Sequence, residues 1–278
     1  MSTLVPPLYA GLVDDASVLP PSITGVPDAL VSFREREQTW FADLLGSFLV
    51  PSSLVGFDGP WSGLSVSVVN DAAIGALPAA VTSLRAAGAT VRQVEAAVAR
   101  RGEDPLPGLA DLAALGLDLE VYAEVPLSWG LLSALDAIAE ARRLGVRIAP
   151  KFRVGGLAAE LFPTPVELAA VICACRDREL PFRLATGIRH ALRHTDPETG
   201  FTHHGFLNVL VASVVAVEGG EVADVAESLA ATHPVPLVEP ARQHRNGPRP
   251  LWAGFGISNV LEPLTELVRL GLVNGGYE

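Results

Sequence analysis

The sequence predicts an α/β protein with the architecture of a (β/α)8 barrel of the TIM type, formed as one domain over residues 1–278. Three observations support this fold class. Short apolar runs alternate with amphipathic stretches along the whole chain, which is typical of strands followed by helices. The joints between them are short, and the apolar runs number eight, as a barrel requires. An open doubly wound parallel sheet is the alternative, because it has the same local pattern.

The expected strands are short apolar runs that end at polar or turn-forming residues. The first closes on Asp14-Asp15, the second at Pro51, and the third at Asn70-Asp71. The fifth carries acidic and aromatic side chains on one face, because successive side chains of a strand point to opposite faces. The eight strands are expected at residues 8–13, 45–50, 64–69, 91–98, 119–125, 146–153, 182–186 and 251–255.

The expected helices show apolar residues at helical spacing and recognisable ends. Glycine follows three of them, at Gly88, Gly116 and Gly145, where it favours helix termination. The residues TPVE at 164–167 form a capping box with proline at the first helical position. Residues 234–249 are expected to form a polar loop. The helices are expected at residues 27–44, 72–87, 106–115, 131–144, 165–178, 206–217, 222–231 and 261–270.

Composition excludes several functional classes. Hydrophobic residues make up 49% of the chain and charged residues 18%, which indicates a folded protein and not a disordered one. The net charge of −11 argues against a nucleic-acid partner, which needs a basic surface. Neither a secretory signal nor an apolar run of membrane-spanning length is evident. Cys173 and Cys175 lie two apart in an expected helix and point away from each other, so we expect reduced thiols and a cytoplasmic protein.

Lys151 is the only lysine in the chain, whereas the other cationic side chains are all arginine. Lysine, unlike arginine, can lose its proton when it is desolvated and can then attack a carbonyl group. Lys151 lies near the end of the sixth expected strand, two residues before Arg153, so both side chains should share a face. This position predicts a catalytic group. The alternative is a structural ion pair with Glu124 on the neighbouring strand, and the two roles are compatible.

Other polar groups also follow the expected strands, where a barrel places its chemistry. We expect Glu124, His190 and Asp15 to move protons, and Asn70 and His194 to contact a substrate. For residues such as Asp15, capping of the next helix is the structural alternative. The histidines show no spacing typical of a metal site, so no cofactor is expected. A divalent metal held by Glu124 and His190 remains a second interpretation.

Two glycine-containing joints predict an anion-binding mouth. Gly155 and Gly156 follow the sixth strand close to Arg153, and a turn at residues 254–258 follows the eighth. Backbone amides exposed by small residues bind phosphate or carboxylate groups well. No nucleotide-binding glycine pattern is present. The expected substrate contacts of the second joint are Gly254, Gly256 and Ser258.

Two local resemblances agree with this site. The residues GFGIS at 254–258 resemble the phosphate-binding loop of the tryptophan synthase α subunit, a (β/α)8 lyase. By this resemblance, the amides of Gly254, Gly256 and Ser258 would hold a phosphate. A lysine that ends the sixth strand resembles the Schiff-base lysine of deoxyribose-phosphate aldolase and related class I aldolases, which implies that Lys151 forms an imine. Such aldolases use a second lysine to lower the pKa of the first, and here Arg153 takes that place.

The sequence therefore predicts a barrel enzyme that acts on a small anionic metabolite, a phosphate or a carboxylate, by lyase or aldolase chemistry at Lys151. Lys151 would act either as a Schiff-base nucleophile or as a cation that stabilises an enolate. A metal-dependent hydrolase or isomerase and a non-catalytic binding or scaffold barrel are the alternatives. No membrane or nucleic-acid partner is expected, and a homo-oligomer stays open.

Overall fold

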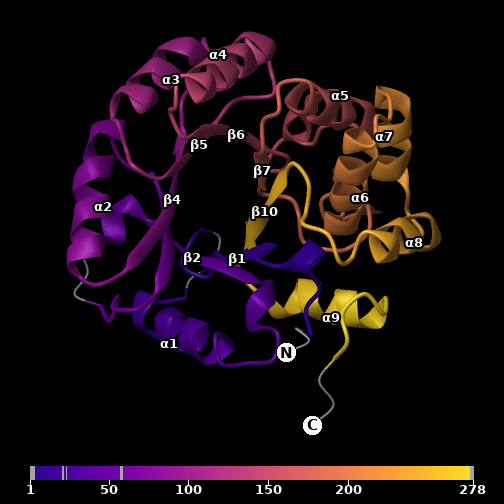
Figure 1. The fold of residues 1–278 in the computed structure, drawn as a ribbon, viewed down its shortest axis with the longest axis horizontal. Coiled ribbons are helices and arrows are strands. Elements are labelled where there is room, and N and C mark those ends of the chain that lie inside the picture. Colours follow the sequence, from indigo (N-terminus) through magenta and orange to yellow (C-terminus); the bar gives the residue numbers. More distant parts are fainter. Residues whose placement is uncertain (1–3, 21, 23, 57–58, 276–278) are drawn as a thin grey trace.

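The computed structural model describes residues 4–20, 22, 24–56 and 59–275 of the chain. Within these residues, eight parallel strands close into a barrel, which confirms the predicted fold class (Figure 1). Around the ring they are β1 (Val13–Asp15), β10 (Trp252–Ile257), β7 (Phe182–Ala185), β6 (Ile148–Arg153), β5 (Glu120–Glu124), β4 (Thr90–Ala97), β3 (Ser65–Val69) and β2 (Leu45–Pro51). Strand β10 pairs with β1 and thereby closes the ring, which excludes the open sheet.

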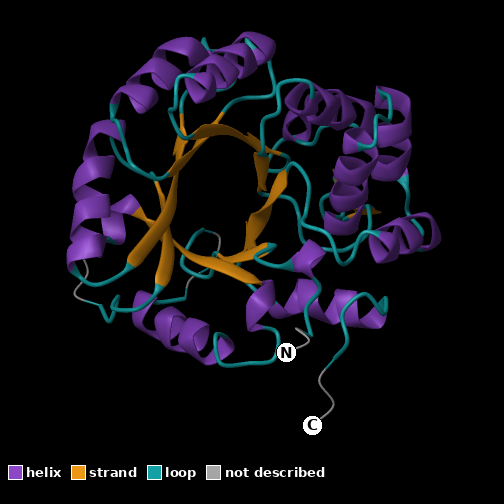
Figure 2. Cartoon of the chain, in the orientation of Figure 1, coloured by secondary structure: helices purple, strands orange, loops and turns teal. Residues whose placement is uncertain are grey.

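Helices surround this ring of strands (Figure 2). They are α1 (Val26–Arg36), α2 (Leu77–Ala86), α3 (Pro105–Ala114), α4 (Leu131–Arg143), α5 (Pro165–Arg176), α6 (Phe206–Val217), α7 (Val222–Ala230), α8 (Val235–Gln243) and α9 (Leu261–Arg269). Short 3-10 turns occur at Pro7–Tyr9, Ala42–Leu44, Ser52–Leu54, Ile74–Ala76 and Ala159–Leu161. The capping box predicted for α5 is present, with Thr164 and Glu167 as its two partners. None of the described helices combines the length and apolarity needed to cross a bilayer.

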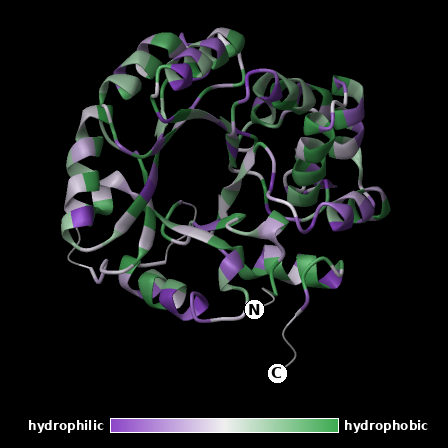
Figure 3. Cartoon of the chain, in the orientation of Figure 1, coloured by the Kyte–Doolittle hydropathy of each residue, from purple (hydrophilic) through white to green (hydrophobic). Residues whose placement is uncertain are grey.

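The apolar core lies mainly between the strands and the helices. Val66, Val68, Phe152 and Leu184 are almost fully buried, and each alternates along its strand with a polar neighbour. Such alternation places one set of side chains against the helices and the other set inside the barrel. Figure 3 shows hydrophilic stretches on the barrel strands as well as on the outer helices. The interior of this barrel is therefore unusually polar, since branched apolar residues normally fill it.

The first strand begins later than the sequence pattern predicts. Residues 8–12 are not a strand, because Pro7 starts a 3-10 turn and Gly11 has a positive φ of 59°. Leu8 and Leu12 are nevertheless fully buried. The apolar residues of this run are therefore part of the core, although most of the run is not a strand. Strand β1 consists of Val13–Asp15, and Asp14 and Asp15 therefore lie inside the strand instead of after it.

The prediction of a polar loop over residues 234–249 is wrong for its first half. Helix α8 forms there although Pro240 lies within it, where proline removes one backbone hydrogen bond. Leu237 and Ala241, four residues apart, are fully buried, so tertiary packing outweighs the low helix propensity. A small antiparallel hairpin, β8 (His194–Thr195) and β9 (Thr202–His203), also lies between β7 and α6 and was not expected.

The prediction of a turn at residues 254–258 is wrong as well. Strand β10 continues to Ile257, so Gly254 and Gly256 lie inside a strand that pairs with β1 and β7. A Cβ on Gly254 would lie 2.5 Å from the Leu12 carbonyl oxygen, and one on Gly256 would lie 2.6 Å from Cδ1 of Leu49. Close approach to the Leu12 backbone and a positive φ of 127° therefore explain Gly254, whereas the Leu49 side chain beside Gly256 can move.

Candidate functional site

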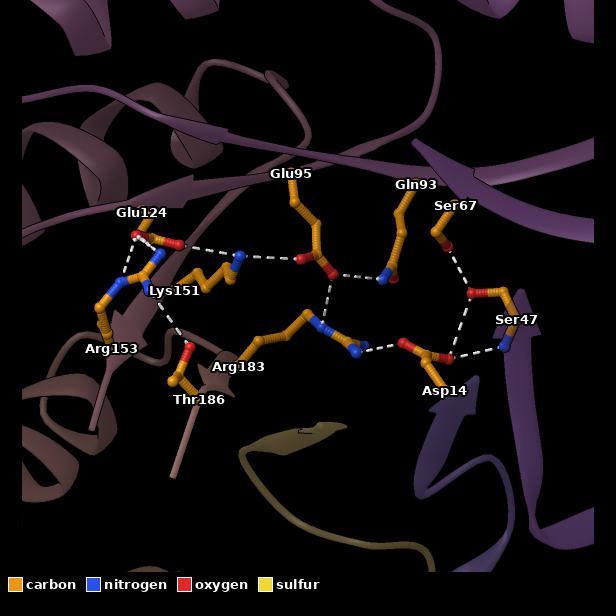
Figure 4. Close-up of polar contacts among 10 residues, drawn as sticks. All are labelled: Asp14, Ser47, Ser67, Gln93, Glu95, Glu124, Lys151, Arg153, Arg183 and Thr186. Atoms are coloured by element: carbon orange, nitrogen blue, oxygen red, sulfur yellow. Dashed lines mark hydrogen bonds and ion pairs between the residues drawn. The ribbon is translucent and has the colours of Figure 1, made fainter. Parts of the chain in front are cut away.

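Six charged side chains form a connected network through the barrel interior (Figure 4). We call this set the interior network; its members are Asp14, Glu95, Glu124, Lys151, Arg153 and Arg183. They come from β1, β4, β5, β6 and β7. Strands β4 and β7 are not neighbours in the ring, so their side chains can meet only across the interior. Three carboxylates face three cations, and the network is neutral when all six are ionised.

Lys151 lies at the centre of the interior network. Its Nζ is 2.9 Å from Oε2 of Glu95 and 2.9 Å from Oε2 of Glu124. The residue is only 6% exposed. Burial alone would lower the pKa of Lys151, but the two carboxylates outweigh it and raise the pKa above its ordinary value. Lys151 is therefore an ammonium ion in this state and not a free amine.

Arg183 joins Asp14 to the rest of the network. Its Nε is 3.1 Å from Oε1 of Glu95, and its guanidinium also pairs with Asp14. The same guanidinium lies 5.3 Å from the centre of the Tyr122 ring, within range of a cation–π interaction. Asp14 in turn accepts hydrogen bonds from the amide of Ser47, at 2.6 Å, and from its hydroxyl, at 3.1 Å. Burial raises the pKa of Asp14 despite these partners.

Glu124 and Arg153 form the end of the network at the carboxyl ends of the strands. Nε and NH2 of Arg153 lie 3.2 and 3.0 Å from Oε1 of Glu124, and NH1 lies 3.3 Å from Oγ1 of Thr186. Burial would raise the pKa of Glu124, but Lys151 and Arg153 outweigh it and lower the pKa. The side chain of Arg153 is 47% exposed, and both residues line the large cavity of this face. Here the network reaches space that a ligand can occupy.

Asp15 does not belong to this site. It is fully buried, pairs with Arg36 of α1 at 2.5 Å and accepts a hydrogen bond from the amide of Ser17. The structure thus brings Lys151, Glu124 and Arg153 together and holds Asp15 against a helix. Asn70 donates to the carbonyl oxygen of Ala72 and so stabilises the turn after β3.

His190 and His194 belong to a separate group beside the β8–β9 hairpin. Nδ1 of His190 is 2.7 Å from Oε1 of Glu266 on α9, and the ring centre lies 4.5 Å from that of His194. His194 stacks on His203 at 5.2 Å. Burial lowers the pKa of His194. Among the contacts of the described residues, none joins His190 or His194 to Glu124 or Lys151. No three potential ligands in the described ranges converge as metal ligands would.

The predicted glycines take structural positions around the mouth. A Cβ on Gly155 would lie 2.7 Å from Cα of Gly187, so the loops after β6 and β7 touch there. A Cβ on Gly156 would collide with Leu161. Ser258 follows β10 and is exposed. Gly155 permits the close loop contact beside Arg153, while any amide contact to an anion stays a prediction.

Sequence reasoning did not select Asp14, Glu95 or Arg183 as site residues. The available signal was alternation, because Gln93 and Glu95 on β4 and Glu120, Tyr122 and Glu124 on β5 share one face of their strands. Arg183 was the one charge in an apolar run. Its partners could not be read from the sequence, because they lie on strands distant along the chain.

Because Lys151 is the only lysine, its reactivity can be measured without ambiguity. We expect an amine-reactive acetylating reagent to modify the native protein at pH 8 at the N-terminal amine and to leave Lys151 unmodified. A protonated, buried amine is a poor nucleophile. Intact-protein and peptide mass spectrometry should show the label on Lys151 only after denaturation. Labelling of Lys151 at equal rates in both states would contradict the ion-pair geometry.

The buried position of His204, which precedes α6, can be tested through the pH dependence of protein stability. His204 is buried, and its Nε2 donates to the Pro163 carbonyl oxygen at 2.8 Å. Burial lowers its pKa from 6.5 to about 4. The unfolded chain therefore binds a proton between these values before the folded chain does, and stability falls as pH falls through this window. We expect a loss of about 3 kcal/mol from this group between pH 7 and pH 4.

The measurement is urea unfolding at several pH values. The His204→Gln variant should show a shallower decline in the free energy of unfolding than the wild type, because it lacks this group. The exposed His233 supplies the matched control, and His233→Gln should reproduce the wild-type curve. Parallel curves for wild type and His204→Gln would show that His204 does not titrate in this way.

Both cysteines are free and buried in α5, as the sequence predicts.

Comparison with known proteins gives no match: no family model, no curated protein and no solved structure matches this chain. The chain has the fold of a TIM-type barrel, which commonly carries enzymes.

Proposed function

We propose that this barrel is an enzyme of the lyase or aldolase type that acts on a small anionic carbonyl compound at Glu124, Lys151 and Arg153. The observation that supports it is the position of the single lysine. Lys151 lies between two carboxylates, and one of these, Glu124, also lines the cavity at the mouth. A fixed cation next to an accessible carboxylate is the arrangement that proton abstraction beside a carbonyl group requires.

Arg153 binds the carboxylate or phosphate group of the substrate in this proposal. Its contacts to Glu124 and Thr186 use three of its five N–H donors. An anion that draws Arg153 toward itself also removes one of the two cations that hold the pKa of Glu124 down. Substrate binding therefore raises the pKa of Glu124 and makes it a better base. The base becomes active only when the substrate is in place.

Lys151 acts as a cation and not as an imine former in this mechanism. Glu124 takes the proton from the carbon next to the substrate carbonyl, and the electron pair moves to the carbonyl oxygen as an enolate. The Lys151 ammonium, held by Glu95 and Glu124, stabilises that negative charge. In carbon–oxygen cleavage, the enolate re-forms the carbonyl group and a carbon–carbon double bond as the oxygen on the next carbon leaves, and that oxygen takes up a proton. In carbon–carbon cleavage, Glu124 instead takes the proton of the β-hydroxyl group, the carbon–carbon bond breaks to give a second carbonyl compound and the enolate, and Glu124 returns the proton to the enolate carbon. The enolate is common to both reactions.

Hydrogen exchange at carbon tests this proposal without knowledge of the complete reaction. In deuterium oxide, the wild-type protein should replace the protons beside the carbonyl group in at least one member of a panel of small oxo acids and phosphorylated carbonyl compounds. Proton NMR records the loss of signal. Lys151→Met should abolish exchange, and Arg153→Met should raise the substrate concentration needed for half the maximal rate.

A borohydride-reduced adduct on Lys151 would keep the aldolase type of activity, but it would contradict the cationic role of Lys151 and restore the imine mechanism. A second result would contradict the function itself. Exchange absent for the whole panel, combined with a Lys151→Met variant that changes stability alone, would favour a scaffold barrel in which Lys151 serves only as an ion-pair partner.

A further inference from the structure

The cavity that meets the interior network extends well beyond the charged groups. Its volume is about 890 Å³, near the upper end of the range for small-molecule sites. It lies between α4, α5 and the segments that follow β4, β5 and β6; both helices lie at the same side of the ring in Figure 1. A small oxo acid would occupy only its inner end.

Most of the cavity wall is apolar. Leu127, Leu131, Leu132 and Phe162 line it, together with Val171 on α5. Water beside such a wall finds few hydrogen-bond partners, so the transfer of a hydrocarbon group from bulk water into the cavity is favourable. The cavity outside the charged end therefore suits a hydrocarbon body.

Large apolar side chains that neighbour the lining residues along the chain are exposed. Trp129, Leu157 and Val166 are 66%, 99% and 61% exposed, and each is within two residues of a lining residue. Trp129 is held in place by a hydrogen bond from its Nε1 to the Gly102 carbonyl oxygen, at 3.2 Å.

Cationic groups mark where an acidic head would bind. Arg153 lines the inner end, and Arg100 and Arg101 also line the cavity. Arg153 is half exposed and retains two N–H donors beyond its contacts to Glu124 and Thr186. Glu124, Glu160 and Glu167 line the cavity as well, so the spare N–H donors of Arg153, and not an excess of positive charge, would hold the anionic head.

We infer that the substrate is an amphiphilic acid, with its anionic carbonyl head at Arg153 and Glu124 and its hydrocarbon body in the cavity between α4 and α5. This inference rests on the proposed function and specifies the class of substrate for that site. An extended or cyclic hydrocarbon body fills the apolar volume, and the head reaches the groups that carry out proton transfer. A purely polar metabolite leaves that volume unused.

Binding of a series of straight-chain carboxylates tests the inference. Butanoate, hexanoate, octanoate and decanoate are titrated by calorimetry below their micelle-forming concentrations. Each added methylene should tighten binding by roughly fourfold, until the body fills the cavity. Arg153→Met should weaken every member of the series by a similar factor, of roughly tenfold or more.

A pair of matched variants separates the cavity from the rest of the surface. Ala170 is exposed on α5 and lines the cavity, so Ala170→Trp should fill it and flatten the dependence on chain length while butanoate still binds. Ala79 is exposed on α2, far around the ring, and Ala79→Trp should bind the series as the wild type does. Urea unfolding of both variants establishes that they are folded.

Three outcomes would overturn the inference. The first is affinity that does not change with chain length. The second is an Ala170→Trp variant with the wild-type dependence. The third is a dimer that Trp129→Ser converts to a monomer while no carboxylate binds, which would assign the exposed apolar side chains to a contact with a second copy of the chain.

The outcomes for the proposed function remain distinct. Carbon-bound hydrogen exchange in short oxo acids without any dependence on chain length would retain the function and reject the amphiphilic substrate. Chain-length-dependent binding without exchange would retain the binding site and reject the chemistry.

Discussion

Replacing Lys151 by methionine is expected to lower the free energy of unfolding by about 3–5 kcal/mol. Glu95 and Glu124 each lie 2.9 Å from the Lys151 Nζ. Without the ammonium, the interior network holds three carboxylates against two cations, Arg153 and Arg183. Removal of one partner from a buried ion pair leaves an uncompensated charge in a region where water cannot solvate it. Urea unfolding followed by circular dichroism measures the loss.

Arg153→Met is the matched control, because it also removes one cation from the network. The Arg153 side chain is 47% exposed, so solvent screens its pair with Glu124, and the expected loss is below about 1 kcal/mol. Equal losses in the two variants would show that burial does not distinguish Lys151 from Arg153. That result would remove the premise that the centre of the network is dry.

Replacing Glu124 by glutamine is expected to slow carbon-bound hydrogen exchange by about 10²- to 10⁴-fold. Glutamine keeps the size and polarity of the side chain but cannot accept the substrate proton. Its oxygen can still accept from Lys151 and Arg153, so binding should change less than rate. The measurement is the rate of deuterium incorporation at saturating concentration, with the substrate that the wild-type protein exchanges fastest.

Glu160→Gln supplies the control for this prediction. Glu160 also lines the cavity and is exposed, but it has no part in the interior network. Its exchange rate should stay within about twofold of the wild-type rate, because a solvated charge at the rim contributes little. If Glu124→Gln and Glu160→Gln slow exchange equally, the carboxylate of Glu124 is not the base.

The sequence predicted the barrel well because strand patterns and helix patterns alternated regularly along the chain. Period-two runs became β2 to β7, and glycines after amphipathic stretches marked the ends of helices such as α2 and α4. The prediction was wrong where packing overrode local preference. Leu237 and Ala241 stabilise a helix around Pro240, and close backbone contacts, not a turn, account for Gly254.

The site was predicted only in part. Lys151, Glu124 and Arg153 were selected correctly as neighbours, because they end adjacent strands and alternate with apolar residues. Whether Lys151 would be a free amine or an ammonium depended on Glu95, which reaches it from a strand that is not adjacent to β6. Such contacts across a closed barrel depend on strand register. The apolar cavity likewise forms only when α4 and α5 pack beside each other.

The protonation state of Lys151, on which its role as a cation depends, can be observed as a single NMR signal. A protein grown with ¹⁵N-labelled lysine contains one labelled Nζ, because the chain has one lysine. Burial opposes the charge, but Glu95 and Glu124 raise the pKa above the ordinary value of 10.5. The nitrogen NMR signal should therefore remain that of an ammonium ion through pH 10.5. A titration of that signal with a midpoint below 10.5 would contradict the cationic role of Lys151.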